Sequence, residues 1–126
     1  MGYSIGLPCQ YCSVAPEDAW LSTDFVVAVP HHSPIGTCHL VVAPRRHAAA
    51  FYDLDVQEQR MIWDALAQLR RRIASTLEVE GFDAGFVDGP AGGVDFHTHI
   101  HLIPRIAGQK TNLPGNAEWV SLSSET

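Results

Sequence analysis

The stretch VDFHTHIHLIPR occupies residues 94–105 and places a histidine at every second position of its centre. Side chains alternate between the two faces of a β-strand, so a strand over residues 96–103 would carry all three imidazoles on one face. The apolar residues between them would lie on the opposite face and pack on a core. The expected imidazole row consists of His97, His99 and His101, and the expected apolar face consists of Phe96, Ile100 and Leu102.

A long amphipathic helix is predicted upstream of this strand. Asp55 suits an N-cap position, and Glu58 lies three residues further on, a variant of the capping box. Apolar residues then recur every three or four positions, which is the spacing of one helix face, and Gly81 suits the end of the helix. The apolar positions are Ile62, Leu66, Leu69, Ile73 and Leu77.

Four more strands are predicted from apolar or β-branched runs bounded by proline and glycine. They cover residues 19–22, 25–29, 39–43 and 82–87. Most of these strands follow one another along the chain, which favours antiparallel pairing over a doubly wound sheet. The sequence therefore predicts an α+β fold with a five-stranded antiparallel sheet and one long helix.

Size and composition limit what the protein can be. The chain has 126 residues, of which 46% are hydrophobic and 17% are charged, as in a folded protein with one core. We expect one domain over residues 1–126, with the motifs in residues 9–105 and a C-terminal tail over 106–126. No apolar run is long enough to cross a membrane. The net charge of −6 argues against sequence-independent binding to nucleic acid.

Two of the three cysteines, Cys9 and Cys12, form a C-x-x-C motif. An odd cysteine count does not suit a secreted disulfide framework, so we expect a cytoplasmic protein. The two thiols have the spacing of zinc ligands, and two further ligands would complete a tetrahedron. The residues alone leave these open among the seven histidines: His31, His32, His39, His47, His97, His99 and His101.

Two histidine segments together resemble the histidine-triad (HIT) family. His97-x-His99-x-His101-Leu-Ile-Pro-Arg is similar to the family signature H-x-H-x-H followed by apolar residues. The segment HLVVAPRRH over residues 39–47 is similar to the family's H-x-L-V-x-P-K-x-H, and the C-x-x-C is frequent in the family. The resemblance covers residues 9–105, and the combination is specific although each motif alone is not.

This resemblance implies a homodimer that binds a small nucleotide substrate and transfers or hydrolyses nucleotidyl groups through a nucleotidyl-histidine intermediate. It implies that His99 is the nucleophile and that His101 and His39 contact the phosphate or assist the leaving group. The implied nucleotide-binding residues are Asp88, Gly92, Gly93 and His101. In relatives with the C-x-x-C motif, two cysteines and two histidines bind a structural zinc ion, which here implies Cys9, Cys12, His47 and His97.

The sequence also departs from the family pattern. The segment Gly92-Gly93-Val94-Asp95 stands where the family usually has Gly-Gln-Ser/Thr-Val, and Asp95 would repel a phosphate, orient His97 or lie exposed to solvent. The usual phosphate-binding Gln and Ser/Thr are missing, and Val27 and Ala28 replace the acid that grips the ribose. About four extra residues precede His39, and we expect His31 and His32 in this segment to be solvent-exposed.

Three functions are therefore compared. The leading hypothesis is a nucleotidyl hydrolase or transferase with His99 as nucleophile, because a neutral imidazole can attack phosphorus near neutral pH. The second is a zinc hydrolase in which His97, His99 and His101 bind a catalytic metal. The third is a non-catalytic, zinc-stabilised nucleotide-binding module.

Overall fold

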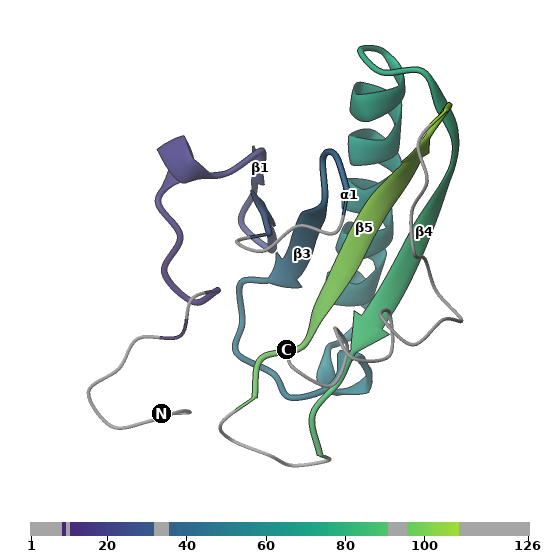
Figure 1. Ribbon diagram of the computed structural model, residues 1–126. Coiled ribbons are helices and arrows are strands. Elements are labelled where there is room, and N and C mark those ends of the chain that lie inside the picture. Colours follow the sequence, from purple (N-terminus) through teal and green to yellow (C-terminus); the bar gives the residue numbers. More distant parts are fainter. Residues whose placement is uncertain (1–8, 10, 32–35, 91–95, 109–126) are drawn as a thin grey trace.

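The computed structural model describes residues 9, 11–31, 36–90 and 96–108 (Figure 1). The predicted nucleotide-binding residues Gly92 and Gly93 lie outside the described residues, as do His32, Asp95 and most of the C-terminal tail.

In these described segments, five antiparallel strands form a single sheet, and one long helix packs on it. The elements in chain order are η1 (Pro16–Asp18), β1 (Leu21–Ser22), β2 (Val26–Pro30), β3 (Leu40–Pro44), η2 (Phe51–Asp53), α1 (Val56–Ala74), β4 (Val79–Val87) and β5 (His99–Ile106). The strand order is β1-β2-β3-β5-β4, and every neighbouring pair is antiparallel. The predicted α+β fold class is confirmed.

Helix α1 begins at the predicted cap and ends earlier than predicted. The Asp55 side chain accepts a hydrogen bond from the Glu58 amide at 2.8 Å, and the Glu58 side chain accepts one from the Asp55 amide at 3.0 Å. This capping box satisfies amides that have no partner inside the helix. The helix ends at Ala74 rather than near Gly81, because β4 begins at Val79 and takes Gly81 into its pairing with β5.

The two faces of the sheet carry different side chains. Helix α1 covers one face of the sheet (Figure 1). Val26, Leu40 and Ile100 lie on that face, in a core that includes Ile62 and Leu69 of the helix. The opposite face holds a smaller apolar cluster of Tyr11, Val27, Val41 and Ala43, and it is also the face of the buried histidines. Strand alternation separates the two sets, so the helix anchors the back of the sheet while the histidines occupy its front.

Strand β5 begins at His99, so the predicted strand over residues 96–103 was placed about three residues too early. Just before β5, the Thr98 amide donates to the Ala48 carbonyl at 2.7 Å, and the Thr98 hydroxyl lies within hydrogen-bond distance of the Val87 carbonyl and the Asp88 carboxylate. These bonds join Thr98 to two loops and to the last residue of β4, and Thr98 itself lies outside the strand ladder. Phe96 also lies before β5, and its ring stacks against that of His99, with centroids 5.8 Å apart. The prediction that Phe96 lies on the apolar face with Ile100 and Leu102 is therefore wrong.

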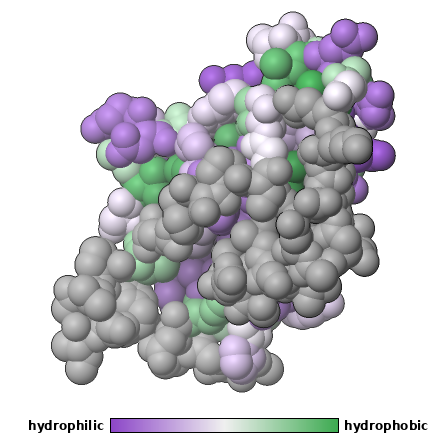
Figure 2. All heavy atoms as spheres, viewed as in Figure 1, coloured by the Kyte–Doolittle hydropathy of each residue, from purple (hydrophilic) through white to green (hydrophobic). Residues whose placement is uncertain are grey.

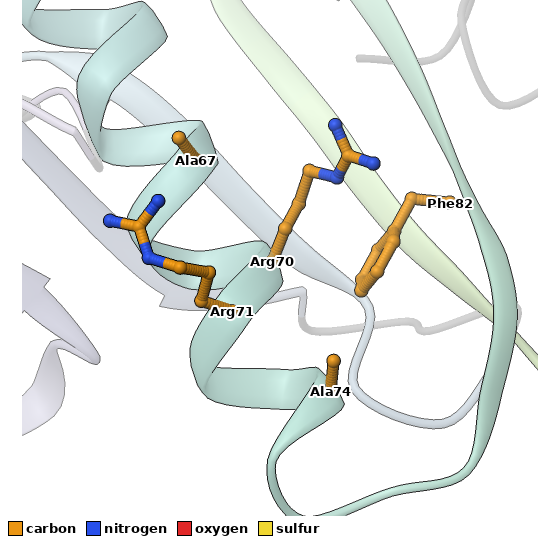
Figure 3. A pocket seen from close by; sticks show the side chains of 5 residues that line it. All are labelled: Ala67, Arg70, Arg71, Ala74 and Phe82. Atoms are coloured by element: carbon orange, nitrogen blue, oxygen red, sulfur yellow. The ribbon is translucent and has the colours of Figure 1, made fainter.

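Figure 2 shows hydrophobic side chains next to hydrophilic ones where α1 turns into β4, at the top of the view. A groove of ≈ 300 Å³ lies there, lined by Ala67, Arg70, Arg71, Ala74 and Phe82 (Figure 3). This groove is on the helix side of the sheet and is therefore separate from the histidine face. Among the described residues, no helix has the length and apolar character needed to span a membrane.

Candidate active site

The histidines of the triad are buried on the sheet face opposite α1. His97, His99 and His101 have relative exposures of 5%, 2% and 0%. The ring of Tyr11 lies against two of them, with centroids 5.6 Å from His97 and 5.1 Å from His99. Although close in sequence, the three histidines enter different groups of side chains.

His97 lies with the other three predicted metal ligands, and Cys9, Cys12, His47 and His97 form a group that could hold a metal ion. Cys9 Sγ lies 3.2 Å from His97 Nδ1, and Cys12 Sγ lies 3.3 Å from His47 Nδ1 and 3.5 Å from His97 Nδ1. In a tetrahedral zinc site, bond lengths of about 2.3 Å to sulfur and about 2.0–2.1 Å to nitrogen separate S and N by about 3.6 Å. The donor set and its spacing therefore fit a zinc ion.

The backbone around this group orients its ligands. Nε2 of His97 donates to the Pro44 carbonyl at 2.7 Å, which leaves the Nδ1 lone pair directed at the thiols. A partner of this kind fixes the tautomer of a metal-binding imidazole. Arg46, next to His47, forms an ion pair with Glu58 at 2.8 Å and donates to the Asp53 carbonyl, so it ties the segment that carries His47 to the start of α1.

His99, the predicted nucleophile, has one ring nitrogen fixed and one available. Nδ1 donates to the His97 carbonyl at 2.9 Å, which places the ring proton on Nδ1 and the lone pair on Nε2. Nε2 is buried and has no hydrogen-bond partner among the described residues. Burial lowers the pKa of His99, and this keeps the imidazole neutral.

His101 pairs with His39 on the histidine face of the sheet. His39 Nε2 lies 2.8 Å from His101 Nδ1, so one ring donates to the other. Burial, together with the neighbouring histidines, lowers the pKa of His39 to about 4 and that of His101 to about 3. Both imidazoles are therefore neutral near pH 7. The His101 ring centroid lies 5.3 Å from that of His99.

His31 was expected to be solvent-exposed, and this prediction is wrong. Its relative exposure is 6%, and its ring stacks on His39 with centroids 4.4 Å apart and planes 3° apart. Val27 and Val29 already face the same side of the sheet, so alternation along β2 carries His31 to that side. Extending the predicted strand past Pro30 would have revealed this placement from the sequence.

The zinc-hydrolase hypothesis requires His97, His99 and His101 to bind one metal ion, and these three residues do not form one ligand group in the described part of the chain. In the described part of the chain, His97 belongs to the cysteine group, His101 belongs to a separate group with His31 and His39, and His99 belongs to neither. The reason is geometric, because alternate residues on a strand lie about 6.5 Å apart and each meets different neighbours.

Asp88, a predicted nucleotide-binding residue, already has protein contacts. Its Oδ1 accepts a hydrogen bond from the Phe51 amide at 2.9 Å and lies 2.6 Å from the Thr98 hydroxyl. These contacts tie the end of β4 to η2 and to the segment before β5. Asp88 is itself solvent-exposed, so contact with a ligand remains a prediction.

Fold and site together define an α+β protein with a histidine-rich site on the sheet face opposite its helix. The sequence model of the HIT domain matches residues 13–108, and the chain belongs to the HIT family. A crystal structure of a hypothetical histidine triad nucleotide-binding protein from Sulfolobus tokodaii superposes with a TM-score of 0.69 at 20% identity, covering 93% of this chain and 87% of that one. This likeness confirms the fold.

Two similar proteins have named activities. The chain is 26% identical over 96 residues to a bifunctional bis(5'-adenosyl)-triphosphatase/adenylylsulfatase of Arabidopsis thaliana, covering 75% of this chain and 53% of that protein. It is 25% identical over 93 residues to a bis(5'-adenosyl)-triphosphatase of Dictyostelium discoideum, covering 73% of this chain and 62% of that protein. The chain thus spans 53% and 62% of the length of these two relatives.

Proposed function

We propose that this protein is a nucleotidyl hydrolase or transferase that acts on a nucleoside phosphate ester, anhydride or phosphoramidate through a covalent intermediate on His99. The observation that carries the proposal is the state of the His99 ring. Nδ1 donates to the His97 carbonyl, while Nε2 keeps its lone pair and has no hydrogen-bond partner among the described residues. A neutral imidazole held in this tautomer is prepared for nucleophilic attack.

The reaction would proceed in two displacements. In the first, the lone pair of His99 Nε2 forms a bond to the nucleotide phosphorus, and the bond from phosphorus to the leaving group breaks with its electron pair. The ring becomes an imidazolium whose Nδ1–H still donates to the His97 carbonyl, which stabilises the positive charge. In the second, water or another acceptor attacks phosphorus and loses a proton, and the N–P bond breaks to restore neutral His99.

His101 and His39 would contact the phosphate. When Nε2 of His39 donates to Nδ1 of His101, the proton of the His101 ring lies on Nε2 and can be donated to a phosphoryl oxygen. Such a donor stabilises the charge that develops on phosphorus oxygens in the transition state. We also retain Asp88, Gly92 and Gly93 as proposed nucleotide contacts.

We propose that Cys9, Cys12, His47 and His97 bind a structural zinc ion. Four protein ligands leave no open coordination position, so the ion would stabilise the fold without taking part in the reaction. The His97 side chain would bind zinc, and the backbone carbonyl of the same residue accepts the Nδ1 proton of His99. The zinc site would therefore help to position the nucleophile.

The decisive test combines His99→Ala with adduct trapping. Wild-type protein incubated with a diadenosine polyphosphate or adenosine phosphoramidate should release adenosine monophosphate and show a nucleotidyl adduct on His99 by mass spectrometry. His99→Ala should lose turnover by a factor of about 10³ or more while keeping its zinc and its melting temperature. Gln68→Ala, on the exposed side of α1, is the matched control and should remain active.

An active His99→Ala protein would contradict the mechanism. Nucleotide binding without turnover by the wild type would instead favour the non-catalytic module.

We further propose a homodimer formed across β4 and the adjacent aromatic side chains. The outer edge of β4 pairs with none of the described strands. Beside it, the rings of Phe51, Trp63 and Phe86 contact one another, although Trp63 is 54% and Phe86 is 39% exposed. Burying such surface would drive association. Analytical ultracentrifugation should show a dimer for the wild type and a monomer for Phe86→Glu.

A cytoplasmic location is also part of the proposal. It is supported by Cys9 and Cys12, which are in no disulfide in the structure, since thiolate ligands to zinc are kept reduced in such a compartment.

A further inference from the structure

The geometry points to a second metal site, formed by His31, His39 and His101 and selective for a divalent transition-metal ion. The three residues form a group that could hold a metal ion, with ligand nitrogens that all lie within 4.8 Å of one another. This group is distinct from the cysteine-containing group, with which it shares no residue.

Three adjacent strands bring these histidines together on one face. The His31 amide, just after β2, donates to the carbonyl of His39, just before β3, at 2.9 Å. Val41, two residues after His39, pairs with His101 of β5. Strand alternation places each of the three histidines on the sheet face opposite α1, so the three side chains point in the same direction from the sheet. The backbone ladder therefore fixes their positions before any ion binds.

The rings are packed closely enough to converge on one ion. His31 stacks on His39, and its centroid lies 5.2 Å from that of His101. Two nitrogens of a tetrahedral site with bonds of about 2.0–2.1 Å lie about 3.4 Å apart. To reach this spacing, the facing nitrogens of His39 and His101, which are 2.8 Å apart, must separate slightly. A ring nitrogen of His31, within 4.8 Å of them, must move slightly closer. Small side-chain rotations achieve both changes.

Proton balance is simple at this site. In the metal-free pair, one of the facing nitrogens of His39 and His101 carries the proton that they share. Metal binding requires that this ring move its proton to its other nitrogen, after which both facing nitrogens offer lone pairs. No net proton need leave the His39–His101 pair, because both rings are already neutral near pH 7.

The donor set determines which ions fit. Imidazole nitrogens suit Zn²⁺, Cu²⁺ and Ni²⁺, whereas Mg²⁺ and Ca²⁺ require oxygen ligands. Three protein ligands leave a coordination position open for water or an anion. His31 and His39 also border a cavity of ≈ 360 Å³ next to Trp20, Thr37 and Cys38, which provides a route for the ion.

Occupation of this site would regulate the enzyme, a consequence that rests on the proposed function. His39 and His101 would be bound to the metal and would no longer form the pair that presents a proton to the phosphate. We therefore expect excess zinc to lower turnover. A chelator whose affinity for zinc matches that of the histidine site should restore it.

The test counts zinc in untagged full-length protein dialysed against buffered Zn²⁺ and analysed by inductively coupled plasma mass spectrometry. Wild type should hold a second zinc ion beyond the one at the cysteine group. His31→Phe keeps the stacked ring without a ligand and should lose only that ion. Cys12→Ala should lose the other ion and keep this one. His31→Cys supplies a new donor and should retain the second ion, so it tests the site even if His31→Phe does not fold.

Two outcomes would overturn the metal site: saturation of the wild type at a single zinc ion that Cys12→Ala removes, or an unchanged zinc count in folded His31→Phe. The count needs no substrate, so the two proposals fail separately. A chain that binds the second zinc without any turnover contradicts the proposed function and supports the metal site. A chain that turns over nucleotide and holds a single zinc supports the proposed function and contradicts the metal site.

Discussion

The cysteine group (Cys9, Cys12, His47 and His97) and the histidine group (His31, His39 and His101) lie on the same face of one sheet, yet they differ in chemistry. The cysteine group includes His97 of the triad, and the histidine group includes His101. His99 lies between these two residues in the sequence and belongs to neither group. The cysteine group has two thiols and a carbonyl that fixes the His97 tautomer. The histidine group has neutral imidazoles that share a proton. Residues two positions apart thus acquire different roles from the side chains that each one meets.

The largest expected effect comes from breaking the cysteine group. Replacing Cys9 and Cys12 by serine, or removing zinc with a chelator, should lower the free energy of unfolding by about 5 kcal/mol or more, because metal binding is coupled to folding. Urea unfolding with and without added zinc measures the change. Loss of the histidine-group ion in His31→Phe should have a much smaller effect on stability. Equal losses in the two variants would remove the distinction between the groups.

Substitution of His101 should damage catalysis without affecting the cysteine group. His101→Ala removes a proposed donor to the phosphate, and we expect turnover to fall by a factor of about 10²–10³, which corresponds to about 3–4 kcal/mol in the transition state. His101→Gln keeps an N–H donor and should lose less. Steady-state kinetics and zinc analysis of both variants give the test. Release of the cysteine-group zinc from His101→Ala would show that the two groups are coupled.

Acidification should destabilise the histidine group in a predictable direction. The pKa values of His39 and His101 are about 4 and about 3 in the folded protein because both are buried. Their unfolded value is about 6.5, so below that pH the unfolded chain binds more protons. Stability is therefore fully present above about pH 6.5 and falls as the pH drops, by up to about 1.4 kcal/mol per pH unit for each histidine that stays neutral.

Urea unfolding, between about pH 7 and about pH 5, of protein that holds zinc at the cysteine group alone measures this slope. His101→Gln does not titrate in this range and should show a shallower dependence. An identical slope in the two proteins would contradict the assignment.

The smallest expected effect concerns support for the cysteine group. Arg46 forms two close contacts with the Glu58 carboxylate and holds the segment that carries His47 near α1. Arg46 is half exposed, so Arg46→Met should cost only about 1 kcal/mol. Faster zinc release to a chelator should accompany this loss, whereas Arg71→Met in the last turn of α1 should leave the release rate unchanged. Unchanged release from Arg46→Met would show that the ion pair does not support His47.

Periodic patterns allowed the fold to be predicted, but the ends of its elements were less predictable. The apolar spacing from Ile62 to Ile73 gives the buried face of α1, and alternation around Ile100 gives the buried face of β5. The start of β5 was placed too early because Thr98 bonds to Ala48 and Asp88, partners that no local pattern reveals.

The candidate site was predictable to a similar degree. The four residues of the cysteine group were implied by the family resemblance, and the structure brings them together. The protein contacts of Asp88 were not predicted, because one of them joins it to Phe51, 37 residues away in the sequence. The burial of His31 was missed because the predicted strand ended at residue 29 and its alternation was not continued to His31.

The sequence by itself determined the antiparallel α+β fold and the presence of alternating histidines, because hydrophobic periodicity and strand alternation are local properties of the chain. Only the tertiary structure decided that His97 meets two cysteines, that His101 meets His39 and His31, and that His99 keeps a free nitrogen lone pair between them. The physical reason is that tautomer, pKa and metal affinity depend on the atoms within a few ångströms of each ring. Those atoms come from strands and loops that the chain brings together only when it folds.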